Sequence, residues 1–114
     1  MRKIILLPVL ALAIFLVGST AYAGQQDFIL VNNSGQAITE IYCSATDNWE
    51  ENVLGNAILK NGETFQLTFP EDQTARYWDL KIVFKNGDNL YWNSLDLFSI
   101  SEMTLDSSGT IHTQ

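Results

Sequence analysis

The chain has 114 residues, of which 13 are acidic and six are basic, so its formal net charge is −7. This length suits one small domain and is too short for two independent hydrophobic cores. The acidic balance excludes the basic surface that nucleic-acid binding requires and leaves cationic partners, divalent metal ions or simple solubility as its consequences.

The first 23 residues predict a cleaved signal peptide. Arg2 and Lys3 precede an apolar run from Ile4 to Val17, and an Ala-x-Ala cleavage site follows at residues 21–23. An uncleaved anchor helix is the alternative, but the apolar run is shorter than the ~20 residues that span a bilayer. We therefore expect a periplasmic or secreted protein that starts at Gly24, carries four basic and 13 acidic residues, and keeps no stable membrane anchor.

Residues 24–114 should form one β domain. Cys43 is the only cysteine, so an internal disulfide is impossible and packing must supply the stability. Aromatic residues are frequent in this part of the chain, and each can bury about 150–250 Å². We expect a monomer.

The first two predicted strands are Asp27–Asn32 and Ala37–Ser44. Turn residues at 33–35 separate them, which favours a hairpin. Residues 45–52 are polar and acidic and predict a loop. Val53–Leu59 should then form a short irregular strand, closed by the turn at 60–63.

The clearest alternation follows, with Phe65, Leu67 and Phe69 on one face of a strand that Pro70 ends. A longer strand then runs to Phe84, and its return strand covers roughly Asn89–Leu97.

The register of that hairpin can be predicted from its apolar residues. A two-residue turn would place Leu90 and Trp92 on the polar face, whereas a three-residue connection, Lys85-Asn86-Gly87, keeps the apolar sets together. With Gly87 in the left-handed region, Ile82 pairs with Leu90 and Leu80 with Trp92.

A final strand around Met103–Leu105 and a short tail at Thr110–Thr113 complete about seven to eight strands. This pattern predicts an all-β fold, a single antiparallel β-sandwich, with a small β-barrel as the alternative.

Few residues could carry catalysis. His112 is the only histidine and lies near the end of the chain, and no Gly-x-Ser-x-Gly motif is present. One histidine and one cysteine cannot build a typical zinc site. We expect a protein that is not an enzyme, with a carboxylate-based hydrolase as the weaker alternative.

The 45–52 loop holds the candidate ligand surface, which comprises Asp47, Trp49, Glu50 and Glu51. Hard cations such as calcium prefer oxygen ligands of this kind, but the order does not match an EF-hand, and a solvated loop is the alternative. Because an acidic loop is more often simply solvated, we expect no cofactor, with calcium as the alternative. Trp49 should cover one end of the sandwich, or else offer an exposed platform to a sugar or a protein.

Cys43 should be a small buried residue of the second strand. The parity of that strand is mixed, because Ile38 and Tyr42 share one face while Ile41 and Cys43 share the other. A bulge or burial on both faces would reconcile them.

Four motifs occur within residues 24–114: the Leu-Val-Asn-x-Ser-Gly opening at 30–35, Trp49 before Leu-Gly at 54–55, the Gly-Glu turn at 62–63 and Trp-Asp-Leu at 78–80. Together they resemble the motifs of a group of small exported bacterial β-domains without established activity. The resemblance covers nearly all of residues 24–114. It implies a β domain outside the cytoplasm and transfers no catalytic residue.

Members of that group commonly carry two cysteines at positions where this chain has Arg76 and Phe98. Their cross-link is not expected here, and burial of Phe98 should take its place. Together, these observations favour a non-catalytic binding or structural module. Its alternative function is calcium-dependent or glycan binding through the 45–52 loop.

Overall fold

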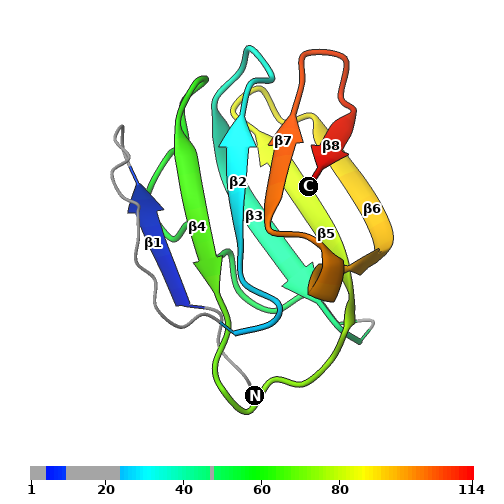
Figure 1. Cartoon of the computed structure of the whole chain (residues 1–114). Helices are drawn as coiled ribbons and strands as arrows, with labels where there is room; N and C mark the ends of the chain where they lie inside the picture. Colours follow the sequence, from blue (N-terminus) through cyan, green and yellow to red (C-terminus); the bar gives the residue numbers. More distant parts are fainter. Residues whose placement is uncertain (1–4, 10–23, 47) are drawn as a thin grey trace.

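A computed structural model describes residues 5–9, 24–46 and 48–114 as two β-sheets packed face to face (Figure 1). One sheet has five strands in the order β1 (Ile5–Val9), β4 (Thr64–Thr68), β2 (Phe28–Asn32), β7 (Glu102–Leu105) and β8 (Ile111–Thr113). The other has three strands in the order β3 (Ile38–Ser44), β5 (Tyr77–Phe84) and β6 (Asn89–Asp96). The sheets do not close into a barrel, so the predicted β-sandwich is confirmed and the barrel alternative is wrong.

The predicted register of the β5–β6 hairpin is confirmed. Ile82 pairs with Leu90 and Leu80 pairs with Trp92. Gly87 has a φ of 95°, and its N–H donates to the carbonyl of Phe84. The left-handed residue at the turn therefore keeps the apolar side chains of both strands on the core face.

The predicted hairpin between the first two strands is wrong. Strand β2 pairs with β4 and β7, whereas β3 pairs with β5 in the opposite sheet. Phe28 and Leu30 of β2 and Ile41 of β3 are all buried, and packing them across the sandwich buries both sets against each other. The β2–β7 pair is parallel, in a fold that is otherwise antiparallel.

The irregular strand expected at Val53–Leu59 does not form. Residues 53–56 are turns, and one isolated bridge joins Leu59 to Ile38. Within this segment Val53, Leu54 and Leu59 are buried, so it contributes apolar side chains to the core without joining the sheets.

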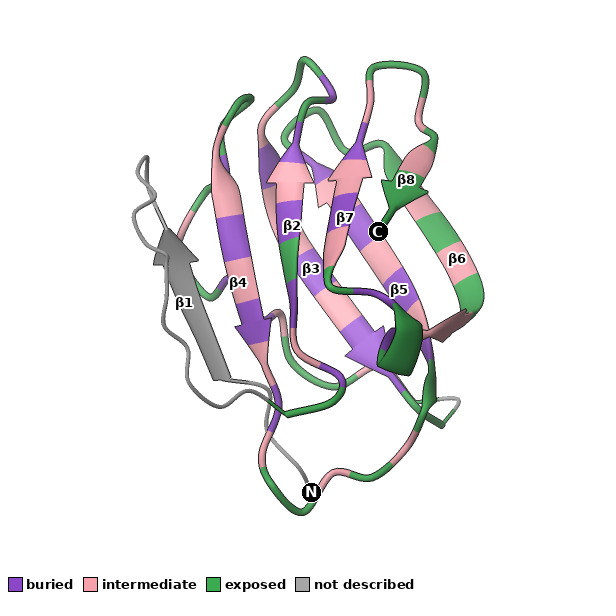
Figure 2. Ribbon diagram, in the orientation of Figure 1, coloured by how far each residue is buried: buried purple, intermediate pink, exposed green. Residues whose placement is uncertain are grey.

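The core lies between the two sheets, where buried residues alternate with more accessible ones along β4 and β5 (Figure 2). Phe65 and Leu67 of β4 are fully buried, and Trp78 of β5 packs edge-on against Phe69 with ring centroids 4.9 Å apart. Trp92 lies at the margin and is only partly buried. Phe98 is 37% exposed, so the expectation that it is buried is wrong.

A bulge reconciles the mixed parity of β3. The register with β5 shifts between Ile38 and Glu40, so Ile38 faces the core together with Ile41 and Cys43. The extra residue in one strand reverses the face of all positions beyond it.

Asn32 explains the Leu-Val-Asn-x-Ser-Gly motif structurally. Its side chain is fully buried and donates to the carbonyls of Gln36 (2.8 Å) and Leu59 (3.0 Å). Its Oδ1 accepts from the N–H and the hydroxyl of Ser34. These bonds tie the crossing between the sheets to the segment before β4.

The predicted signal peptide lies largely outside the described residues, which exclude 1–4 and 10–23. The backbone of β1 within it pairs antiparallel with β4, from Ile5 with Thr68 to Val9 with Thr64. No helix among the described residues is long and apolar enough to span a membrane.

Candidate functional site

A row of polar and aromatic residues crosses the outer face of the three-stranded sheet. Tyr42 of β3 pairs with Lys81 of β5, and Lys81 pairs with Tyr91 of β6. The flanking residues on these strands alternate with them and face the core, as Leu80 and Ile82 do. The row therefore lies on the solvent side of the sheet.

Trp49 extends this row from the neighbouring loop. Its ring centroid lies 5.6 Å from that of Tyr91, in an edge-to-face arrangement, and 6.4 Å from that of Tyr42. Trp49 is half-buried, while Tyr91 is 52% exposed. We call Tyr42, Trp49, Lys81 and Tyr91 the aromatic face.

Charged side chains lie on either side of Tyr42 in the aromatic face. The Lys81 ammonium lies 5.6 Å from the centroid of Tyr42, within the range of a cation–π contact. The Tyr42 hydroxyl donates to Glu40 at 2.6 Å, and this bond raises the pKa of Tyr42. The hydroxyl therefore stays protonated, and the face offers a cation, a carboxylate and apolar rings side by side.

Of the predicted ligand surface, the structure describes Trp49, Glu50 and Glu51, and these three residues lie in different surroundings. Trp49 packs on the outer face of the sheet, so the expectation that it covers one end of the sandwich is wrong. Glu50 lines a pocket, and Glu51 is exposed. Asp47 lies outside the described residues.

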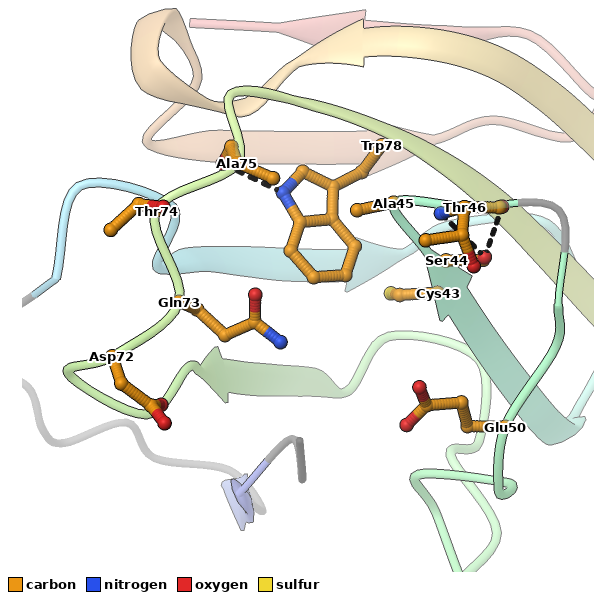
Figure 3. A pocket seen from close by; sticks show the side chains of 10 residues that line it. All are labelled: Cys43, Ser44, Ala45, Thr46, Glu50, Asp72, Gln73, Thr74, Ala75 and Trp78. Atoms are coloured by element: carbon orange, nitrogen blue, oxygen red, sulfur yellow. Dashed lines mark hydrogen bonds between the residues drawn. The ribbon is translucent and has the colours of Figure 1, made fainter. Parts of the chain in front are cut away.

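The pocket that Glu50 lines has a volume of about 390 Å³ and opens between the loops that follow β3 and precede β5 (Figure 3). Glu50 and Asp72 lie on opposite sides of its mouth, with Gln73 beside Asp72. Cys43 and Trp78 lie deeper, and the Trp78 indole N–H donates to the carbonyl of Ala75 at 2.9 Å. This volume lies near the lower end of small-molecule sites.

Cys43 was predicted to be buried, and this is confirmed. Burial raises the pKa of its thiol to about 12. At neutral pH the sulfur is therefore protonated and lacks the thiolate needed for nucleophilic attack or metal binding.

The side chain of His112 contributes to the turn between β7 and β8. Its Nε2 lies 2.7 Å from Asp106, whose carboxylate also accepts from the Ser108 hydroxyl and from the N–H of Thr110. The pKa of Asp106 is lowered, chiefly by the Ser108 hydroxyl and then by His112. This exposed cluster closes the β7–β8 connection.

Metal ligands do not converge among the residues that the structure describes. No group of three His, Cys, Asp or Glu side chains lies close enough there to hold an ion. A calcium site that uses Asp47 stays a prediction, because that residue is outside the described part.

Sequence reasoning identified Trp49 but missed its partners, Tyr42 and Tyr91. The signal was present in the hairpin register, because pairing Ile82 with Leu90 also places Lys81 beside Tyr91 on the polar face. The misassigned β2–β3 hairpin concealed the neighbouring position of Tyr42, since β3 actually lies next to β5.

Comparison with known proteins gives no identity. No protein-family model, curated protein or solved structure matches the chain significantly. The function must therefore be inferred from the geometry of the aromatic face and its surroundings.

Proposed function

We propose that the protein is a non-catalytic binding module of the periplasm or cell exterior that holds a glycan on its aromatic face. The observation that carries this proposal is the contact of Trp49 with Tyr42 and Tyr91 on the solvent side of the three-stranded sheet. Three rings gathered outside the core expose apolar area to water, and covering that area on binding is favourable.

The composition of the aromatic face suits a sugar. Aromatic rings provide flat apolar surfaces for the C–H faces of a pyranose, while polar neighbours hydrogen-bond to its hydroxyls. Lys81 and Glu40 supply a donor and an acceptor beside the rings. The sheet holds Tyr42 and Tyr91 in fixed register, so little conformational entropy is lost when a ligand covers them.

The residues that could act in catalysis support a non-catalytic role. The Cys43 thiol is buried and protonated, and His112 belongs to an exposed turn. Glu50 and Asp72 line the same pocket, on opposite sides of its mouth. The export signal predicted from Arg2, Lys3 and the apolar run supports a location outside the cytoplasm.

Calcium dependence through the 45–52 loop is retained as the second form of this proposal. Glu50 and Glu51 flank Trp49 in sequence, so an ion bound there would fix the segment that carries the ring. Its effect on the aromatic face would be indirect, because Trp49 and Glu50 lie in different surroundings.

The test follows Trp49 fluorescence in a Trp78→Phe/Trp92→Phe variant whose folding is first verified by circular dichroism. Soluble oligosaccharides of glucose and of N-acetylglucosamine are titrated with and without calcium. We expect a saturable change in emission with an oligosaccharide. A response that needs calcium and is lost in Glu50→Gln/Glu51→Gln would support the calcium-dependent form.

Two results would count against glycan binding. If Trp49 emission stays unchanged with every oligosaccharide of the series, these glycans are excluded as ligands. A saturable response that persists in Tyr91→Ala and Tyr42→Ala would place the ligand away from the aromatic face.

A further inference from the structure

Strand β4 pairs with a strand along each of its two edges, and one of these partner strands belongs to the predicted signal peptide. It pairs with β2 along one edge and with Ile5–Val9 along the other. If cleavage after Ala23 removes the leader, β2 stays and β1 is lost. The exported protein would then present the outer edge of Thr64–Thr68.

The hydrogen bonds around β2 show which backbone groups face that edge. The N–H of Asn32 donates to the carbonyl of Glu63 (3.0 Å), and the N–H of Phe69 donates to Asp27 (2.9 Å). Backbone groups alternate in direction along an antiparallel strand, so the odd-numbered residues of β4 face β2. The groups of Thr64, Gln66 and Thr68 therefore face the edge that β1 covers.

The proline of β1 fits this arrangement. Pro8 pairs with Phe65, whose backbone groups face β2, so the missing N–H of Pro8 costs no bond to β4. Leu7 pairs with Gln66, and its N–H faces β4 by the same alternation. The edge thus accepts an extended segment in a defined register and needs donors only at alternate positions.

The edge also lacks the usual protection against strand addition. Strand β4 contains neither a charged residue nor a proline within Thr64–Thr68. Natural sheet edges commonly carry such residues or are covered, because an open edge pairs with other strands. Here the covering strand is the part of the chain that export would remove.

We propose that, after export, the edge of β4 binds an extended segment of another protein, antiparallel and in the register of Ile5–Val9. This proposal rests on the export and cleavage included in the proposed function, but not on glycan binding. The incoming strand should be apolar at the positions opposite Phe65 and Leu67, because these two residues face the core.

Charge favours a foreign segment over a second copy. The exported chain would carry 13 acidic and four basic residues, so two copies repel each other at long range. The segment seated on the edge follows Arg2 and Lys3 in the sequence. A partner strand with a basic flank would therefore be attracted to the acidic domain.

The experiment uses the protein purified after export, with its start determined by intact mass. The probe is a synthetic peptide of residues 2–10 with the natural sequence. Two matched peptides are N-methylated, one at Leu7, whose N–H faces β4, and one at Leu6, whose N–H faces away. Binding is measured by fluorescence anisotropy of a labelled peptide, and the amides of β4 are followed by NMR.

We expect a protein that starts at Gly24 and binds both the natural and the Leu6-methylated peptides. Methylation at Leu7 should weaken binding at least about tenfold, because it removes a backbone bond and places a methyl group against the strand. The amide signals of Thr64, Gln66 and Thr68 should shift. A Tyr91→Ala variant should bind the peptide unchanged, which separates this site from the aromatic face.

Several results would overturn the proposal. An exported protein that retains residues 1–23 would keep its edge filled. Equal binding of the two methylated peptides would show that the edge backbone is not used. A stable dimer that excludes the peptide would assign the edge to a second copy.

Discussion

The guanidinium carbon of Arg76 lies 5.6 Å from the ring centroid of Phe98, at the two positions where the resemblance would place cysteines. Arg76 also forms two hydrogen bonds to Asp96, from Nε to Oδ1 and from Nη2 to Oδ2, each 2.9 Å long. The pKa of Asp96 is lowered, chiefly by this bond to Arg76. A cation–π contact and an ion pair thus join Arg76, which precedes β5, to the end of β6 and the turn that follows it.

Phe98 is partly exposed, so its removal should reduce the stability of the protein less than removal of a buried aromatic residue. Phe65→Ala and Trp78→Ala should each lower the free energy of unfolding by about 3–5 kcal/mol, because both side chains are buried. Phe98→Ala should lower it by less than about 1 kcal/mol. Urea denaturation of the three variants measures the difference. A large decrease in unfolding free energy for Phe98→Ala, together with small decreases for the other two variants, would contradict the assignment of Phe65 and Trp78 to the core and of Phe98 to the surface.

Asn32 should be the most sensitive polar residue of the fold. Asn32→Ala removes the bonds to the carbonyls of Gln36 and Leu59 and takes away the acceptor of the buried Ser34 N–H, so it should cost about 2–3 kcal/mol of unfolding free energy. Asn33→Ala is the matched control, since Asn33 is exposed and its backbone N–H, which the substitution keeps, donates to the carbonyl of Leu105. Equal stability of the two variants would contradict the structural role of the motif.

Cleavage before Gly24 should create an ion pair. The nitrogen of Gly24 lies 2.8 Å from Oδ2 of Asp27, whose Oδ1 accepts from the N–H of Phe69. In the uncleaved chain burial raises the pKa of Asp27, although both backbone bonds oppose this effect. A free amino terminus at Gly24 would bring a positive charge to this carboxylate and lower its pKa.

The pH dependence follows from that charge. The pair needs both charges, so its contribution to stability is lost as the pH falls through the pKa of Asp27 and is also lost as the pH rises past about 8, where the amine loses its proton. The protein with a free Gly24 amine should therefore be more stable than its Nα-acetylated form near pH 6, by about 1 kcal/mol, and equally stable near pH 10. Thermal melts of both forms test this. A constant difference across the range would contradict the pair.

Cys43 should react with thiol reagents only after unfolding. Because burial raises the pKa of its thiol to about 12, the native protein at pH 8 holds the sulfur protonated and inaccessible. Labelling with Ellman's reagent should be at least about a hundredfold slower in buffer than in guanidinium chloride. Rapid labelling of the folded protein would show that the floor of the adjoining pocket is open.

Local patterns predicted the strands that have strong alternation, and turn chemistry predicted the β5–β6 register. The partner of β3 was missed, because the Asn33–Gly35 turn suggested a hairpin while the bonds of Asn32 direct the chain into the opposite sheet. Such a choice depends on contacts between residues 27 positions apart. Trp49 was singled out because a large ring in a polar loop is unusual, but its neighbours required knowledge of which strands are adjacent.

The most direct measurement of the central claim compares two tyrosines of the same sheet. Tyr91 and Tyr77 are 52% and 55% exposed, but Tyr91 contacts Trp49 whereas Tyr77 contacts Arg76. Isothermal titration calorimetry with the oligosaccharide that changes Trp49 emission should show at least about tenfold weaker binding for Tyr91→Ala, as expected for a central aromatic contact, and binding within about twofold of the original for Tyr77→Ala. Equal affinities of the two variants, or a selective loss in Tyr77→Ala, would contradict a glycan site on the aromatic face.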